Sequence, residues 1–144
     1  MSPEDSKPSR PALDPETRAT IEASVRRSHA GEISFGEVVV ALAGVGVESY
    51  YADYRQGRLT YYFPSGLTHE VELQAPGLAV AEVFDGDAVR AAIRGAQAGE
   101  VFYPEFVRRT VAAGCVGYFV WITGRHVRYL GRRGESHVEE FPSR

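Results

Sequence analysis

The sequence predicts an α+β protein made of two tandem α-α-β-β-β repeats, with antiparallel sheets and pseudo-two-fold symmetry. The first observation is internal similarity: residues 30–55 match residues 98–123 without a gap, and seven of the 26 pairs are identical, where about one or two are expected from composition. The second is periodicity, because each copy changes from a helical to an alternating hydrophobic pattern. The third is the short glycine-containing segments between the strands, which favour antiparallel meanders covered by helices on one face.

The repeat divides the chain into four parts. We expect a disordered tail over residues 1–13, since it is polar and contains three prolines. Repeat 1 follows over 14–73, then a linker over 74–83 and repeat 2 over 84–142. A single repeat is too small to bury much of its surface, so we expect the two repeats to form one compact domain.

Each repeat is predicted to begin with two helices. Asp14 followed by proline is typical of a helix start, and this helix should end near His29. Asp85 or Asp87 should begin its counterpart in repeat 2. The second helices are expected over 35–43 and 104–113, with the glutamates of their first turns as caps and a glycine after each as the stop signal.

Three strands should follow the helices of each repeat. They are expected over 47–55, 58–63 and 67–73, and over 115–123, 125–130 and 135–141. The match between the copies pairs Tyr50 with Tyr118 and His69 with His137. With one residue deleted in the second copy between these points, it also pairs Arg58 with Arg125 and Tyr62 with Tyr129.

The composition excludes several classes of protein. A net charge of -3 and a mean hydropathy of -0.23 give no general attraction to nucleic acid or to a membrane. No segment has the apolar length of a membrane span, and the N-terminus lacks a signal peptide core. These features predict a cytoplasmic protein that binds neither nucleic acid nor membrane.

No metal or cofactor site is expected. The turn between the first two helices imitates the back half of a calcium loop, but Arg26 and Arg94 stand where the first carboxylate ligand is needed. Cys115 is the single cysteine, so an internal disulfide is impossible. Its apolar surroundings predict a small buried side chain and not a nucleophile.

Two sets of paired residues are candidates for a functional site. His69 and His137, with Tyr62 and Tyr129, are candidate acid-base groups if the third strands line one cleft between the repeats. We expect His69 to be the more buried of the two histidines and His137 the more exposed. The alternative is that both are hydrogen-bonded structural histidines.

The second set consists of candidate ligand-binding residues. Arg58 and Arg125 are expected on the same strand face as Tyr62 and Tyr129, where a guanidinium and a phenol can hold a small anionic ligand. Tyr50 and Tyr118 are further candidates. The alternative is packing between strands, with the arginine stem lying over an aromatic ring.

Part of the chain resembles a family of small uncharacterised bacterial proteins that are often labelled "phage envelope protein". The resemblance covers about residues 20–142 and is more specific in repeat 2. It rests on residues 83–94, Gln97-Ala98-Gly99-Glu100, Tyr103-Pro104-Glu105-Phe106, Gly124-Arg125 and 134–139. Repeat 1 departs from it at Gly36, where repeat 2 has Pro104. The resemblance implies no established activity, cofactor or catalytic residue.

These observations favour a binding or regulatory module that acts on a partner protein or a small anionic ligand, with a homodimer as one form of association. One alternative is an enzyme that uses His69 and His137 in the cleft between the repeats. Another is a phage-derived structural or assembly protein.

Overall fold

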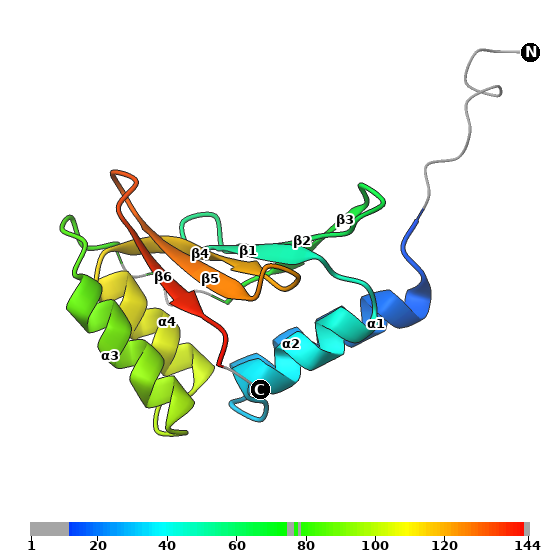
Figure 1. Cartoon of the computed structure of the whole chain (residues 1–144), viewed down its shortest axis with the longest axis horizontal. Helices are drawn as coiled ribbons and strands as arrows, with labels where there is room; N and C mark the ends of the chain where they lie inside the picture. The colour runs from blue at the N-terminus through cyan, green and yellow to red at the C-terminus, as the bar shows by residue number, and fades with distance from the viewer. Residues whose placement is uncertain (1–11, 75–76, 78, 143–144) are drawn as a thin grey trace, which may run out of the picture.

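Four helices and six strands occur in the described part of the chain, which comprises residues 12–74, 77 and 79–142 of a computed structural model (Figure 1). In the first half they are α1 (Pro15–His29), α2 (Phe35–Gly44), β1 (Ser49–Asp53), β2 (Arg58–Tyr62) and β3 (Thr68–Glu72). In the second half they are α3 (Gly86–Gln97), α4 (Tyr103–Ala112), β4 (Cys115–Trp121), β5 (His126–Gly131) and β6 (Ser136–Glu140). The predicted α+β class is confirmed. Most of the predicted tail, and residues 75, 76 and 78 of the predicted linker, lie outside the described residues.

The first helix of each half begins at an aspartate cap. The Asp14 carboxylate accepts a hydrogen bond from the Thr17 amide at 3.2 Å. Asp85, and not Asp87, does the same for α3 by accepting from the Ala88 amide at 3.1 Å. Each contact satisfies an amide that the first turn of a helix leaves without a partner.

The second helices begin differently from each other. In α2 the Ser34 hydroxyl accepts from the Glu37 amide at 3.2 Å, and the Glu37 carboxylate accepts from the Ser34 amide at 3.0 Å. This is a complete capping box. In α4 the expectation of a glutamate cap is wrong, because Glu105 instead pairs with Arg108 at 2.9 Å and Arg109 at 3.1 Å. The residue before α4 is Phe102, which has no hydroxyl with which Glu105 could form a capping box.

All six strands form one antiparallel sheet in the order β3-β2-β1-β4-β5-β6. The halves join where β1 pairs with β4, and Tyr51 lies opposite Phe119 at the centre of that pairing. The two pairs of helices lie on the same side of the sheet (Figure 1). As the first and last strands in this order, β3 and β6 are the two edges of the sheet and lie on opposite sides of the molecule.

The register determines which side chains face the helices, because successive residues of a strand point to opposite faces. Two rows across the sheet form the helix-facing layer. They are Val71-Leu59-Ala52-Tyr118-Tyr129-His137 and His69-Tyr61-Tyr50-Val120-Val127-Glu139. Apart from the edge residues, these side chains belong to the hydrophobic core, together with buried residues of the helices such as Ile21 and Val107.

The register also corrects the predicted match between the halves. Tyr50 pairs with Tyr61, and Tyr118 pairs with Tyr129. The counterpart of Tyr129 is therefore Tyr61 and not Tyr62, and no deletion is needed. The deletion was suggested by aligning Gly57 with Gly124, but the left-handed backbone of Gly57 (φ 67°) recurs at Arg125 (φ 59°).

Candidate functional site

The face of the sheet opposite the helices is not covered by another layer of the described residues (Figure 1). Three rows of side chains point to it, alternating with the two rows of the core. The rows are Glu72-Arg58-Asp53-Gly117-Leu130-Ser136, Glu70-Thr60-Tyr51-Phe119-Arg128-Val138 and Thr68-Tyr62-Ser49-Trp121-His126-Glu140. We call this surface the open face.

Four aromatic side chains form a cluster at the centre of the open face, which we call the aromatic patch: Tyr51, Tyr62, Phe119 and Trp121. Phe119 contacts the other three, with ring centroids 5.5 Å from Tyr51, 5.8 Å from Tyr62 and 4.2 Å from Trp121. The rings of Phe119 and Trp121 are nearly parallel, at an angle of 9°. Trp121 is 37% exposed. The patch is thus a preformed apolar surface in contact with solvent.

A glycine in β4 shapes the patch. A Cβ atom at Gly117 would collide with the carbonyl oxygen of Ala52 and would lie 2.9 Å from the Tyr51 hydroxyl oxygen. Tyr51 therefore lies across Gly117, in space that another residue would fill. Burial, and next the nearby Asp53 carboxylate, raise the pKa of Tyr51, so its phenol is neutral at pH 7.

Charged groups surround the patch unevenly. On the β2–β3 side, Glu70 and Glu72 are exposed, and Arg58 lies 3.6 Å from Glu70. Asp53 accepts hydrogen bonds from two amides of the following turn. On the β5 side, Arg128 is exposed in the same row as Phe119. One side of the open face therefore carries two exposed glutamates beside Arg58, and the other presents the Arg128 guanidinium together with the exposed Glu140 of β6.

The candidate histidines lie far from each other. His69 is in β3 and His137 in β6, so the whole width of the sheet separates them, about 24 Å for five intervals of about 4.8 Å. The expected cleft lined by both imidazoles is therefore wrong. Both side chains are half-buried on the helix-facing side, and both Nε2 atoms are shielded without a hydrogen-bond partner among the described residues. The Nε2 atom of His137 lies 3.6 Å from the Glu139 carboxylate.

Three of the candidate tyrosines are core residues. Tyr50, Tyr118 and Tyr129 are only 4%, 5% and 7% exposed. Burial raises the pKa of each of them, and the Tyr118 hydroxyl lies 2.8 Å from that of Tyr103. These positions give them a role in packing between the sheet and the helices and leave a ligand little access.

The two candidate arginines do not share a site with each other. Arg58 lies on the open face, whereas Arg125 lies in the turn before β5. There its guanidinium donates to the carbonyl oxygen of Pro142 at 3.2 Å and lies 5.5 Å from the centre of the Phe141 ring. Tyr62 shares the open face with Arg58, whereas Tyr129 points to the helices and Arg125 lies outside the strand, so the expected arginine and tyrosine pair does not form in the second half.

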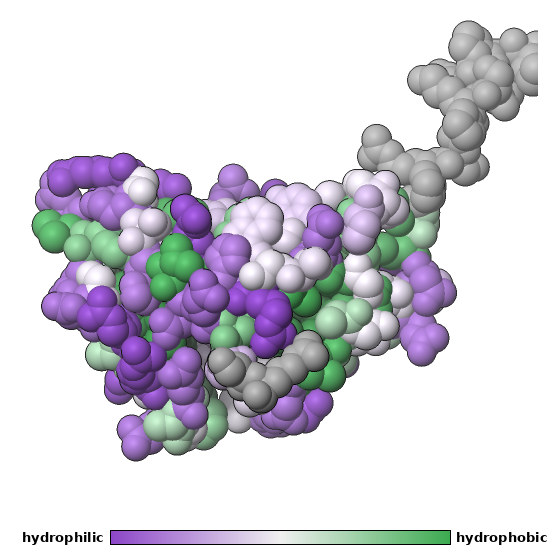
Figure 2. All heavy atoms as spheres, viewed as in Figure 1, coloured by the Kyte–Doolittle hydropathy of each residue, from purple (hydrophilic) through white to green (hydrophobic). Residues whose placement is uncertain are grey.

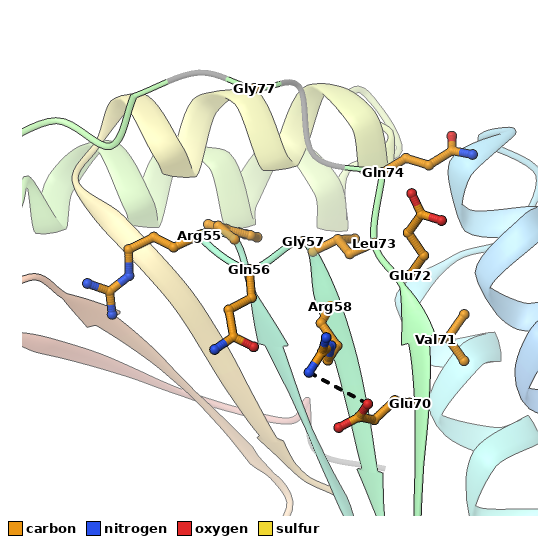
Figure 3. Close-up of a pocket in the computed structure, with 11 residues that line it drawn as sticks. Arg55, Gln56, Gly57, Arg58, Glu70, Val71, Glu72, Leu73, Gln74 and Gly77 are labelled. Carbon is orange, nitrogen blue, oxygen red and sulfur yellow. Dashed lines mark ion pairs between the residues drawn. The ribbon is translucent and has the colours of Figure 1, made fainter.

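Two of the hollows on the surface of the described residues lie near candidate residues or a half-buried histidine. The larger, about 790 Å³, lies beside the β1–β2 turn and is lined by residues that include Arg58, Glu70 and Gln74 (Figure 3). Its arginine is already paired with Glu70, as the dashed line in Figure 3 shows. The smaller, about 370 Å³, lies between the turn after α1 and the start of α4 and includes His29 and Phe102. Burial lowers the pKa of His29.

In the part of the chain that the structure describes, no group of three or more His, Cys, Asp or Glu side chains is placed to hold a metal ion. None of the described helices has the length and apolar character to cross a membrane. Cys115 is fully buried, and burial raises the pKa of its thiol to about 12.

Of the sequence candidates, Tyr62 belongs to the aromatic patch and Arg58 lies beside it. The other members were missed because Tyr51 and Phe119 come together only through the pairing of β1 with β4. Strand alternation gave the one available signal, since positions 119 and 121 share a face.

Residues 41–140 match the family model described as "Protein of unknown function (DUF1398)". The match spans more than half of the chain, which therefore belongs to this family. A search of curated proteins finds no match.

Proposed function

We propose that this member of the family is a binding module that takes a partner protein on the open face of its sheet, with the aromatic patch at the centre of the contact. The observation that carries the proposal is the stacked pair Phe119 and Trp121 on a sheet face that none of the described helices covers. Aromatic side chains are enriched at the centres of protein interfaces, where they account for much of the binding energy.

The arrangement of the rings favours a protein over a nucleic acid or a sugar. A base or a sugar ring stacks on a free aromatic face. Phe119 covers one face of the Trp121 indole at 4.2 Å, and the His126 ring lies 6.2 Å from the indole and narrows access to it further. Phosphate groups would also meet Glu70 and Glu72 beside the patch, and like charges repel. Apolar protein side chains need only the exposed rings.

The charges around the patch define the chemistry of the partner. A basic side chain suits the β2–β3 side, where Glu70 and Glu72 are exposed. An acidic side chain suits Arg128 on the β5 side. The partner segment therefore carries apolar residues at its centre and charges of opposite sign at its ends, which sets its direction across the strands.

The test uses selected peptides as defined probes. Twelve-residue peptides are selected by display on the immobilised protein, and their binding is measured with a fluorescent label and by the emission of Trp121, the single tryptophan of the chain. We expect binding to weaken at least tenfold in Trp121→Ser, about 1.4 kcal/mol. Val83→Ser is the control, because Val83 is 69% exposed and lies outside the patch.

Arg128→Glu supplies a second comparison on the same peptides. This substitution should weaken the binding of peptides that carry an acidic end. It should have little effect on the melting temperature of the protein, since Arg128 is exposed. Equal binding of the selected peptides by Trp121→Ser and the wild type would refute the proposal, as would peptides that leave Trp121 emission unchanged.

A further inference from the structure

Helix α2 presents an apolar surface that no other part of the described chain covers. Its sequence contains one charged residue, Glu37, and it buries one side chain completely, Leu42. Val40 is 73% exposed. Phe35, at the start of the helix, is 43% exposed although one side of its ring meets Phe141 at 5.7 Å. Hydrophobic atoms are visible at the surface in the region of α2 (Figure 2).

The corresponding helix of the second half does not share this surface. By the ungapped match of the two copies, Val40 corresponds to Arg108 and Ala41 to Arg109. Both arginines are ion-paired with Glu105 on the exposed side of α4. The fold therefore accepts charge at this position, and packing within the chain does not explain an exposed valine there.

The spacing along α2 indicates what covers it. Gly36, Val40 and Gly44 follow one another at intervals of four residues, which places them along one side of the helix. All three are exposed, and a Cβ atom at either glycine would meet nothing within 4 Å. A glycine lies four residues before Val40 and another four residues after it, so the exposed stripe is symmetric about Val40.

From this symmetry we infer that α2 is the contact helix of a homodimer, in which it packs antiparallel against α2 of a second copy. A two-fold axis at Val40 places this residue against Val40 of the second copy and each Gly36 against the other chain's Gly44. A two-fold contact must be complementary to itself, and the glycines let the two helices approach closely. Glu37 then lies beside Ala43 and away from the second Glu37.

The contact is small, so the dimer is weak. A ten-residue helix is about 15 Å long, and two such helices bury less than the roughly 800 Å² per partner of a standard interface. We expect dissociation on dilution through the micromolar range. The inference does not rest on the proposed function. A dimer would nevertheless present two open faces, which would increase the avidity for a partner that carries two copies of its binding segment.

A cysteine at position 40 tests the axis directly. Two cysteines form a disulfide only when their Cα atoms come within about 7 Å, so Val40→Cys should link to itself under mild oxidation. Arg108→Cys is the matched control, at the same helix position of the second half, and should link at least tenfold more slowly. The native Cys115 is fully buried and should stay unreacted in both variants.

Sedimentation velocity of the full chain provides the second readout. The wild type should form dimers between 10 µM and 1 mM, about the range expected for a contact of this size, and Val40→Arg should stay a monomer with an unchanged circular dichroism spectrum. Val40→Ser serves the same purpose if the arginine variant does not fold. The inference is overturned by a wild type that is monomeric at the highest concentration, by dimers that survive both substitutions, or by equal linking rates at positions 40 and 108.

Discussion

Gly46 and Gly114 occupy matching places after the second helix of each half, and alanine substitutions at the two should have different costs. Both have a left-handed backbone, with φ of 86° and 91°. An alanine in that conformation costs about 1–2 kcal/mol. At Gly46 an added Cβ meets nothing within 4 Å, so Gly46→Ala should lose only this amount.

At Gly114 the chain before α3 passes directly over the glycine. An added Cβ would collide with the carbonyl oxygen of Val83 and lie 2.8 Å from the Cα atom of Phe84. Carbon atoms in contact prefer at least about 3.5 Å, so this segment must move by roughly 0.7 Å. The hydrogen bond from the Asp85 amide to the Ala113 carbonyl oxygen, at 2.7 Å, holds it in place. Such overpacking costs about 1–3 kcal/mol more.

Urea unfolding of the two variants measures the difference. We expect Gly114→Ala to lose about 2–5 kcal/mol in total, which is the sum of the conformational and the packing costs. The melting temperature should fall in parallel, by about 4 °C for each kcal/mol of stability lost. Equal losses at the two glycines would refute the reasoning, because they would show that the Val83–Phe84 backbone does not lie against Gly114.

The remaining predictions concern buried groups. Cys115 should react with a thiol reagent only on unfolding, because its thiol is buried with a pKa of about 12; reaction in the native protein at the rate of a free thiol would contradict this. Because burial lowers the pKa of His29 from 6.5, its neutral form favours folding: this contribution is present above pH 6.5 and is lost as the pH falls toward the lower folded-state pKa. In His29→Gln, the free energy of unfolding in urea should therefore fall less steeply as the pH drops below 6.5. An unchanged slope would exclude His29 as the cause of this pH dependence. Thr110→Val should cost about 1–3 kcal/mol in urea unfolding. The Thr110 hydroxyl donates to the Phe106 carbonyl oxygen at 2.9 Å, so the Tyr54 hydroxyl, 2.8 Å away, donates to Thr110 and would lose its acceptor. Tyr54→Phe should cost less, since Thr110 keeps its backbone partner; the reverse order would contradict this assignment of donors.

Local signals predicted most of the secondary structure. Asp14 caps its helix as expected, and strands form where the hydrophobic pattern alternates, although β1 is shorter than predicted. These features depend on neighbours in the chain. The match of the copies failed near Gly57, because a left-handed turn residue can be either a glycine or an arginine, and an identity-based alignment follows the glycine.

The candidate site was less predictable. Tyr62 is a candidate by residue type alone, but its place on the open face depends on Phe119, which belongs to the other half of the chain. His69 and His137 match in sequence, yet they lie on β3 and β6, the two outer strands, and so come to opposite edges of the sheet. Sequence similarity between repeats shows which residues correspond, and it does not show which ones meet.

The class of the fold, the order of its elements and the buried state of Cys115 follow from the sequence alone, because hydrophobic period, helix caps and glycine turns act over a few residues. The pairing of β1 with β4, the single sheet of all six strands, and the contact of Tyr51 with Phe119 on the open face appear only in the three-dimensional structure. Strands of the two halves pair through backbone hydrogen bonds, which almost any residue can make, so the side chains do not reveal the pairing. The same pairing separates the two histidines and brings together aromatic residues that are sixty-eight positions apart.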